Sequence, residues 1–191
     1  MPTAVAPPET PLLIDADRSC LVIVDVQEAL APTMFDPRRV YRGGSILLRA
    51  ATRLGLPLLV TEQYPKGLGH TVGELRDLVP DDAVMEKLHF SCAADPAIRA
   101  RVEGFGRPRV VLAGIESHIC VLQTALGFKQ LGFAPVVVAD ACASRAEGNY
   151  HAALDRLAAA GVTVATVEMV LFEWLHRAGT PEFKELSPLI R

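Results

Sequence analysis

The clearest indication of the fold lies in the stretch Val110-Val-Leu-Ala-Gly-Ile-Glu-Ser-His-Ile-Cys-Val-Leu-Gln-Thr-Ala-Leu-Gly-Phe128. The residues from Arg109 to Ala113 are mostly β-branched and apolar, which is typical of a buried parallel strand. Gly114 interrupts this run, and apolar residues then recur at helical spacing. The segment therefore predicts a strand, a short turn and a helix, with Cys120 in the first helical turn, just past the carboxyl end of the strand.

The same alternation of short apolar runs and helical periodicity extends along the chain. It predicts strands at residues 19–25, 58–61, 83–86, 109–113, 135–139 and 162–167, and helices at residues 36–54, 96–103, 147–160, 168–175 and 181–187. Strands that alternate with helices form parallel sheets with right-handed crossovers. We therefore predict an α/β fold of three αβα layers, in which six parallel strands in the order 3-2-1-4-5-6 carry helices on both faces. This single domain would span residues 19–191, after an extended proline-rich arm at residues 1–18.

The composition is typical of a compact enzyme. The chain has 191 residues, of which 50% are hydrophobic, and a formal net charge of −3. Because it has no basic tract and few aromatic residues, we expect no nucleic-acid partner, and no stretch has the length of a membrane span. The four cysteines show no C-x-x-C spacing, and the N-terminus does not resemble a secretion signal, so we expect reduced thiols in a cytoplasmic protein.

Three reactive side chains follow three of the predicted strands. Asp25 ends the apolar run that begins at Ser19, Lys87 follows the third strand, and Cys120 follows the fourth. Taken singly, each has a common structural explanation: an aspartate that caps a helix, a solvated lysine, or a small buried thiol. Together, at the carboxyl ends of parallel strands, they form a workable chemical unit.

In this unit Cys120 would attack a carbonyl carbon, and Asp25 would take up the thiol proton and later return it. Lys87 would keep Asp25 ionised and, together with the helix N-terminus, would lower the pKa of the thiol. Strands one and four are neighbours in the predicted order, whereas Lys87 comes from the more distant third strand, so its long side chain must close that gap. If Lys87 serves only the chemistry, its replacement by alanine should leave stability nearly unchanged.

These residues resemble the pattern of the isochorismatase-like cysteine hydrolase superfamily, which includes nicotinamidases and N-carbamoylsarcosine amidohydrolases. The resemblance covers residues 17 to about 170, and the tract Val60-Thr-Glu-Gln-Tyr-Pro-Lys-Gly-Leu-Gly69 resembles the subgroup of isochorismatase domain-containing proteins. It implies the catalytic residues Asp25, Lys87 and Cys120, and a small-molecule substrate.

The resemblance also implies a cis peptide bond between Ile115 and Glu116, which would aim the N–H of Glu116 at the site. Together with the N–H of Cys120, this donor would form an oxyanion hole for a tetrahedral intermediate. Members of the family commonly assemble as dimers or larger oligomers, so we expect a homo-oligomer.

Nicotinamidases of this superfamily carry an Asp-x-His motif and a further histidine after the second strand. The corresponding region here runs from Glu62 to His70 and departs from that spacing, although both end residues are of metal-binding types. No G-x-G-x-x-G motif follows the first strand, and the chain has no Walker lysine motif. We therefore predict a site without metal or cofactor.

Residues beyond the second and third strands are candidates for binding the substrate, because they would lie on the same rim as the three reactive side chains. These candidates are Gln63, Tyr64, Phe90 and Ser91. Ordinary loop packing explains each of them equally well. His118 lies two positions before Cys120, a spacing at which helical side chains point in different directions, so a structural role is favoured for it.

The pattern as a whole favours a cysteine hydrolase that cleaves a small amide or a related C–N bond. A true isochorismatase, which cleaves a vinyl ether, is the nearest alternative, but that chemistry needs no thiol nucleophile. From a different class, the chain is compatible with a catalytically silent binding or scaffold subunit. The presence of Asp25, Lys87 and Cys120 together counts against that alternative.

Overall fold

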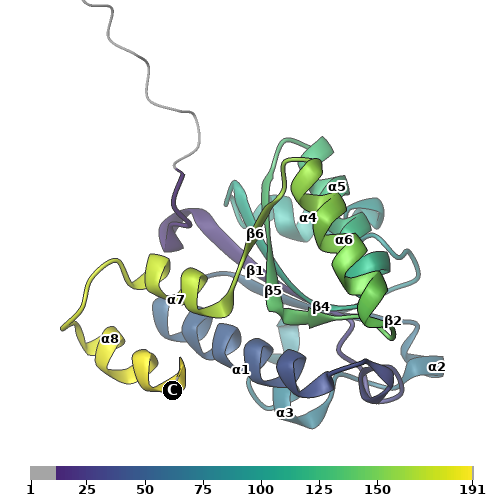
Figure 1. Cartoon of the computed structure of the whole chain (residues 1–191), viewed down its shortest axis with the longest axis horizontal. Coiled ribbons are helices and arrows are strands. Elements are labelled where there is room, and N and C mark those ends of the chain that lie inside the picture. The colour runs from purple at the N-terminus through teal and green to yellow at the C-terminus, as the bar shows by residue number, and fades with distance from the viewer. Residues whose placement is uncertain (1–11, 191) are drawn as a thin grey trace, which may run out of the picture.

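Six parallel strands form the centre of the protein (Figure 1). The structure, a computed structural model, describes residues 12–190. The strands lie in the order β3-β2-β1-β4-β5-β6 and every neighbouring pair is parallel, which confirms the predicted α/β fold and strand order. They are β1 (Ser19–Val24), β2 (Leu58–Gln63), β3 (Val84–Lys87), β4 (Arg109–Ile115), β5 (Ala134–Ala143) and β6 (Thr163–Ala165).

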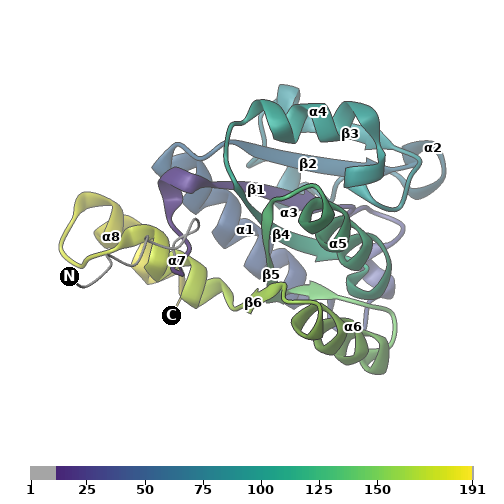
Figure 2. The ribbon, with the colours of Figure 1, turned by 90° about the horizontal axis from the view of Figure 1, so that it is seen from above.

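Helices cover both faces of this sheet, as Figure 2 shows. The first layer consists of α1 (Pro37–Leu54), α3 (Gly73–Arg76), α7 (Val167–Leu175) and α8 (Pro181–Leu186). The opposite layer consists of α4 (Pro96–Gly104), α5 (Leu122–Gln130) and α6 (Glu147–Ala159). A short helix, α2 (Pro65–Leu68), follows the end of β2. No helix in the described part of the chain is long and apolar enough to cross a membrane.

The two central strands, β1 and β4, are buried along their whole length. Because helices cover both faces of the sheet, these strands are apolar without the alternation that a half-exposed strand would show. All six residues of β1 pair with β4, from Ser19 with Arg109 to Val24 with Gly114. The carboxyl ends of these two strands therefore lie side by side, as the predicted strand order requires.

The local structure differs from the sequence prediction near these carboxyl ends. Cys120 lies in a π-helical turn, Ser117–Val121, that precedes α5, whereas the sequence predicted the first turn of a regular helix. π-Helical turns of this kind are frequent at functional sites. β5 extends to Ala143 rather than to residue 139, and its register with β4 shifts between Leu112 and Gly114.

The predicted N-terminal arm falls partly on residues 1–11, which lie outside the described residues. The rest of the arm is not extended throughout. Ala16–Arg18 form a turn of 3-10 helix that the carboxylate of Asp15 caps. Ile14 is buried, and its N–H donates to Oε2 of Glu173 at 2.5 Å. This part of the arm therefore packs as part of the domain.

At Gly114, β4 passes too close to β1 to accommodate a side chain. Gly114 has a φ of 117°, and a Cβ atom added there would lie 2.1 Å from the carbonyl oxygen of Val24. Residues with a side chain rarely adopt such a φ. Because Asp25 directly follows Val24, Gly114 determines how the end of β1 meets the segment that carries Cys120.

We expect Gly114→Ala to lower the free energy of unfolding by at least about 3 kcal/mol, because a backbone clash adds to the cost of a positive φ. Urea denaturation followed by circular dichroism measures this change. Gly148→Ala is the matched control, since Gly148 lies in α6 and an added Cβ meets nothing within 4 Å there. The control should be neutral or gain up to about 1 kcal/mol. Equal losses in the two variants would contradict this role of Gly114.

Candidate active site

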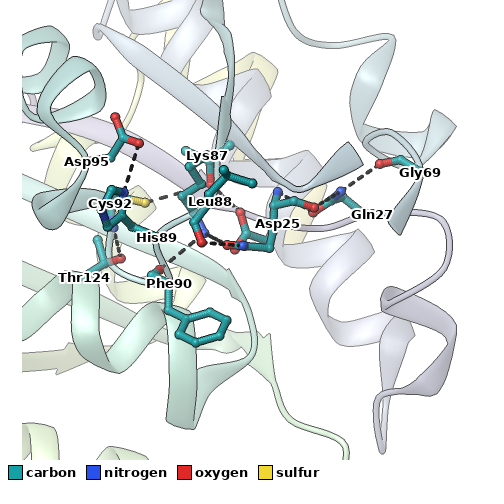
Figure 3. Close-up of polar contacts among 12 residues, drawn as sticks. Asp25, Gln27, Gly69, Lys87, Leu88, His89, Phe90, Cys92, Asp95 and Thr124 are labelled. Carbon is teal, nitrogen blue, oxygen red and sulfur yellow. Dashed lines mark hydrogen bonds and ion pairs between the residues drawn. The ribbon is translucent and has the colours of Figure 1, made fainter. Parts of the chain in front are cut away.

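Asp25 and Lys87 form an ion pair in the interior of the protein. Nζ of Lys87 lies 2.6 Å from Oδ2 of Asp25, and neither side chain has exposed surface (Figure 3). Two buried charges are tolerated only when they neutralise each other and their polar atoms are hydrogen-bonded. The structure thus brings together two of the three predicted reactive residues, and Lys87 is not a solvated surface lysine.

The side chain of Lys87 bridges the intervening strand β2 to reach Asp25. Its ammonium group donates to Asp25, to Oε1 of Gln63 at 2.7 Å and to the carbonyl oxygen of Phe90 at 3.3 Å. An ammonium group has three protons, so these acceptors use all of them. Gln63 ends β2 and pairs with Lys87 in the sheet, so the strand that separates Lys87 from Asp25 also supplies an acceptor between them.

Because this pair is buried, the expected effect of removing Lys87 on the stability of the protein changes. An alanine at this position would leave the Asp25 carboxylate inside the protein without its cation. Breaking a buried ion pair from one side typically costs about 3–5 kcal/mol. The expectation that stability would stay nearly unchanged, which assumed a lysine with a purely chemical role, is therefore replaced by an expected loss of stability.

The carboxylate of Asp25 accepts hydrogen bonds on both oxygens. Oγ1 of Thr61 donates to Oδ1 at 2.7 Å, Lys87 holds Oδ2, and Cys120 lines the same cavity as the carboxyl group. Burial raises the pKa of Asp25 above its ordinary value, while Lys87, Thr61 and Cys120 oppose that rise. Asp25 is therefore a buried carboxylate that shares a cavity with a thiol.

The thiol of Cys120 is more weakly acidic than the sequence predicted. Burial raises its pKa, the charge of Asp25 raises it further, and Lys87 opposes both effects. The expected lowering of this pKa is therefore wrong, because burial and the nearby carboxylate outweigh the cation. Cys120 is therefore a protonated thiol at rest.

Cys120 and Asp25 open into a small cavity of about 150 Å³. Its lining combines apolar walls with polar groups, and consists of Asp25, Leu30, Gln63, Leu68, Phe90, Glu116, Ile119, Cys120 and Arg145. The sequence did not single out Leu30, Leu68 and Ile119, because apolar residues carry no chemical signal until the fold places them around a cavity.

Two of the four substrate-binding candidates line this cavity and two do not. Gln63 and Phe90 line it, although the side-chain amide of Gln63 is already engaged by Lys87 and by the carbonyl oxygen of Leu88 at 2.9 Å. Tyr64 is half exposed and lines a neighbouring surface groove. The hydroxyl of Ser91 donates to the carbonyl oxygen of Gln123 at 3.1 Å.

Glu116 is among the residues that line the cavity. The peptide bond between Ile115 and Glu116 is cis, as the resemblance implied. The Glu116 carboxylate accepts from the backbone N–H of Arg145 at 2.9 Å and from its guanidinium group at 2.8 and 3.1 Å. Burial would raise the pKa of Glu116, but these bonds and the charge of Arg145 outweigh it and hold the pKa below its ordinary value. Sequence reasoning missed Arg145, because the predicted strand ended at residue 139, whereas β5 extends to Ala143, two positions before Arg145.

The two residues of metal-binding type after β2 are engaged with protein partners. Oε1 of Glu62 accepts from the N–H and the hydroxyl of Thr71 at 2.7 and 2.8 Å, and Oε2 lies 2.9 Å from Nδ1 of His70. These contacts tie the loop after α2 to the sheet. Within residues 12–190, no group of three or more His, Cys, Asp or Glu side chains is arranged to hold a metal ion.

His118 also takes part in a structural network. Its Nδ1 lies 2.9 Å from the hydroxyl oxygen of Ser144, and the side-chain amide of Asn149 lies 3.4 Å from its Nε2. The side chain does not line the cavity that holds Cys120. This placement fits the structural role that the sequence favoured.

Comparison with known proteins agrees with this geometry. Residues 19–169 match the model of the isochorismatase domain. The chain belongs to the isochorismatase family. It is 40% identical over 167 residues to isochorismatase domain-containing protein 1 of Salmo salar, a match that covers 87% of this chain and 59% of that protein. A secreted isochorismatase effector of Phytophthora sojae is 37% identical over 177 residues, with 91% and 84% of the two chains covered. The cytoplasmic location of the present chain stays a prediction.

Solved structures with a similar fold extend the comparison. The structure titled MAR1 ribonuclease from Caenorhabditis elegans has a TM-score of 0.87 and 34% identity, and the match covers 93% of this chain and 92% of that one. The YcaC gene product of Escherichia coli, titled an octameric hydrolase of unknown specificity, has a TM-score of 0.88 at 23% identity, with 95% and 92% covered. At this level of identity, YcaC supports the shared fold alone.

In this isochorismatase-family chain we expect iodoacetamide to modify Cys120 before any other cysteine. Burial raises the pKa of all four thiols, so access to the reagent, and not acidity, separates them. Cys120 opens to the cavity, whereas Cys20, Cys92 and Cys142 have no exposed surface. Peptide mapping after brief treatment identifies the labelled residue, and the urea-unfolded protein, in which all four thiols should react, is the control. Preferential labelling of another cysteine in the folded protein would contradict this assignment.

Proposed function

We propose that this protein is a cysteine-dependent hydrolase that cleaves a small amide or a related C–N bond through a thioester on Cys120. The observation that carries the proposal is a thiol that lines the same cavity as a buried carboxylate, which is itself ion-paired to a buried lysine. The isochorismatase family supports a hydrolase, and the cavity of about 150 Å³ supports a small substrate.

In the first half of the proposed reaction, Sγ of Cys120 attacks the carbonyl carbon while Asp25 takes the thiol proton. The carbonyl oxygen becomes negatively charged, and the backbone N–H groups of Glu116 and Cys120 are the proposed donors to it. Both residues line the cavity, which supports this assignment. The C–N bond then breaks, and Asp25 delivers its proton to the leaving nitrogen.

In the second half, a water molecule attacks the thioester and gives a proton to Asp25. The carbon–sulfur bond breaks, the acid product leaves, and the proton returns from Asp25 to the sulfur of Cys120. Lys87 touches neither substrate nor water in this scheme, because its three protons are held by protein acceptors. Its role is to stabilise the charged form of Asp25 before each proton transfer.

The relatives suggest a second substrate class, since the C. elegans structure is titled a ribonuclease. A phosphodiester substrate is commonly bound by uncompensated basic side chains. Here the one cation among the cavity-lining residues, Arg145, is paired with Glu116. The cavity therefore favours an uncharged amide over an RNA backbone.

We expect wild-type protein to release ammonia from at least one member of a panel of small amides and ureides, and Cys120→Ala to release none. Intact-mass measurement during turnover should detect the acyl group on the wild-type chain alone, and thermal unfolding should show that Cys120→Ala keeps its fold. Isochorismate and RNA belong in the same panel. Turnover of either by Cys120→Ala would support the vinyl ether or ribonuclease alternative and contradict a thiol nucleophile, whereas a chain inert toward the whole panel would favour a scaffold.

We expect Lys87→Ala to lower kcat/KM by about a hundredfold or more. Without the ammonium group the pKa of Asp25 rises further, and Asp25 acts as a base only above its pKa. The acid limb of the rate profile should therefore move to higher pH. Lys87→Arg should not restore the rate, because a planar fork cannot replace a compact ammonium group among three fixed acceptors.

The control for this prediction is Lys184→Ala, an exposed position on α8. It should match the wild type in rate and in urea denaturation, whereas Lys87→Ala should lose about 3–5 kcal/mol of stability near neutral pH. Superimposable pH–rate profiles for wild type and Lys87→Ala would remove Lys87 from the mechanism.

A further inference from the structure

Strand β2 lies in the sheet between β1 and β3, and it contacts Asp25 as well as Lys87. Thr61 lies in β2 and is fully buried, and it pairs with Val24 at the end of β1. Its carbonyl oxygen accepts from the N–H of Asp25 at 3.1 Å, and its hydroxyl donates to Oδ1 of Asp25 at 2.7 Å. Thr61 therefore contacts both the backbone and the carboxylate of the proposed base, although it does not line the cavity.

A second buried group, the thiol of Cys92, contacts the Thr61 hydroxyl. It donates to Oγ1 of Thr61 across 4.0 Å. The N–H of Cys92 donates to Oγ1 of Thr124 at 2.9 Å (Figure 3). Burial raises the pKa of Cys92 to about 11, so this thiol stays protonated and able to donate. Because the Asp25 carboxylate can only accept, it takes the single hydroxyl proton of Thr61, and a lone pair of the Thr61 oxygen is left for the Cys92 thiol.

We propose that Thr61 is a positioning residue for the reaction, which fixes one oxygen of Asp25 and, supported by Cys92, favours the charged carboxylate that accepts the Cys120 proton. This inference rests on the proposed role of Asp25 as the base. Lys87 holds Oδ2 while Thr61 holds Oδ1, so the carboxylate cannot rotate without losing a charge-assisted hydrogen bond. The buried Cys92 thiol, which the proposed reaction does not use, thereby gains a role.

Thr61→Val tests this inference because valine has the shape of threonine but no hydroxyl. We expect the alkylation of Cys120 by iodoacetamide at pH 7 to slow by about tenfold or more, since a hydrogen bond to the charged carboxylate is lost. The acid limb of the alkylation profile should move to higher pH, and Thr61→Ser, which keeps the hydroxyl, should restore it. A purely structural role would not produce this movement.

Thr124→Val is the matched control. It makes the same change at a fully buried threonine that contacts Cys92 but not Asp25. Its alkylation profile should coincide with that of the wild type, even if its melting temperature falls. A profile shifted as far as that of Thr61→Val would show a general effect of core disruption and overturn the inference.

Asp25→Asn separates this inference from the function on which it rests. If Asp25→Asn abolishes the alkylation step but the Thr61→Val profile coincides with that of wild type, the inference about Thr61 fails and the hydrolase proposal survives. If Asp25→Asn alkylates like wild type, the proposed function itself fails.

If Thr61→Val does not fold, Cys92→Ala tests the inference in its place. It removes the donor to Thr61, so the acid limb should move in the same direction by a smaller amount, and Cys92→Ser, which keeps a donor, should restore it. A Cys92→Ala profile identical to wild type would then overturn the inference.

Discussion

The buried ion pair between Asp25 and Lys87 is the interaction on which the rest of the site depends. Removing each of these charges from water costs several kcal/mol, and their attraction offsets that cost only when the remaining polar atoms are also satisfied. The surrounding fold meets this requirement with Thr61, Gln63 and the carbonyl oxygen of Phe90. These contacts hold the carboxyl ends of the three adjacent strands β1, β2 and β3 in one arrangement.

Gln27 extends this arrangement from the ion pair to the wall of the cavity. Its side-chain amide accepts from the N–H of Gln63 at 2.7 Å and donates to the carbonyl oxygens of Gln63 and Gly69 at 3.0 and 2.7 Å. A single buried amide thus continues the sheet hydrogen bonds past the end of β1 and holds the loop that carries Leu68. Displacement of β2 would therefore disturb both the charges and the shape of the cavity.

The chemistry of Cys120 follows from competition between opposing electrostatic effects. A helix N-terminus and a nearby lysine favour a thiolate, but the cysteine is 6% exposed and faces a carboxylate. Burial and the carboxylate prevail, so the resting site holds a protonated thiol beside its base.

The sequence by itself determined the alternation of strands and helices, the strand order and the three strand ends where Asp25, Lys87 and Cys120 lie, because these follow from local periodicity and from the rules of parallel sheets. Tertiary structure alone decided the burial of Lys87, the engagement of the Gln63 amide, the pairing of Glu116 with Arg145 and the direction of the Cys120 pKa. Asp25 and Lys87 are 62 residues apart, and Glu116 and Arg145 are 29 apart. How far each of these atoms is shielded from solvent, and which charges surround it, depends on neighbours from several strands. No local stretch of sequence contains all of these neighbours.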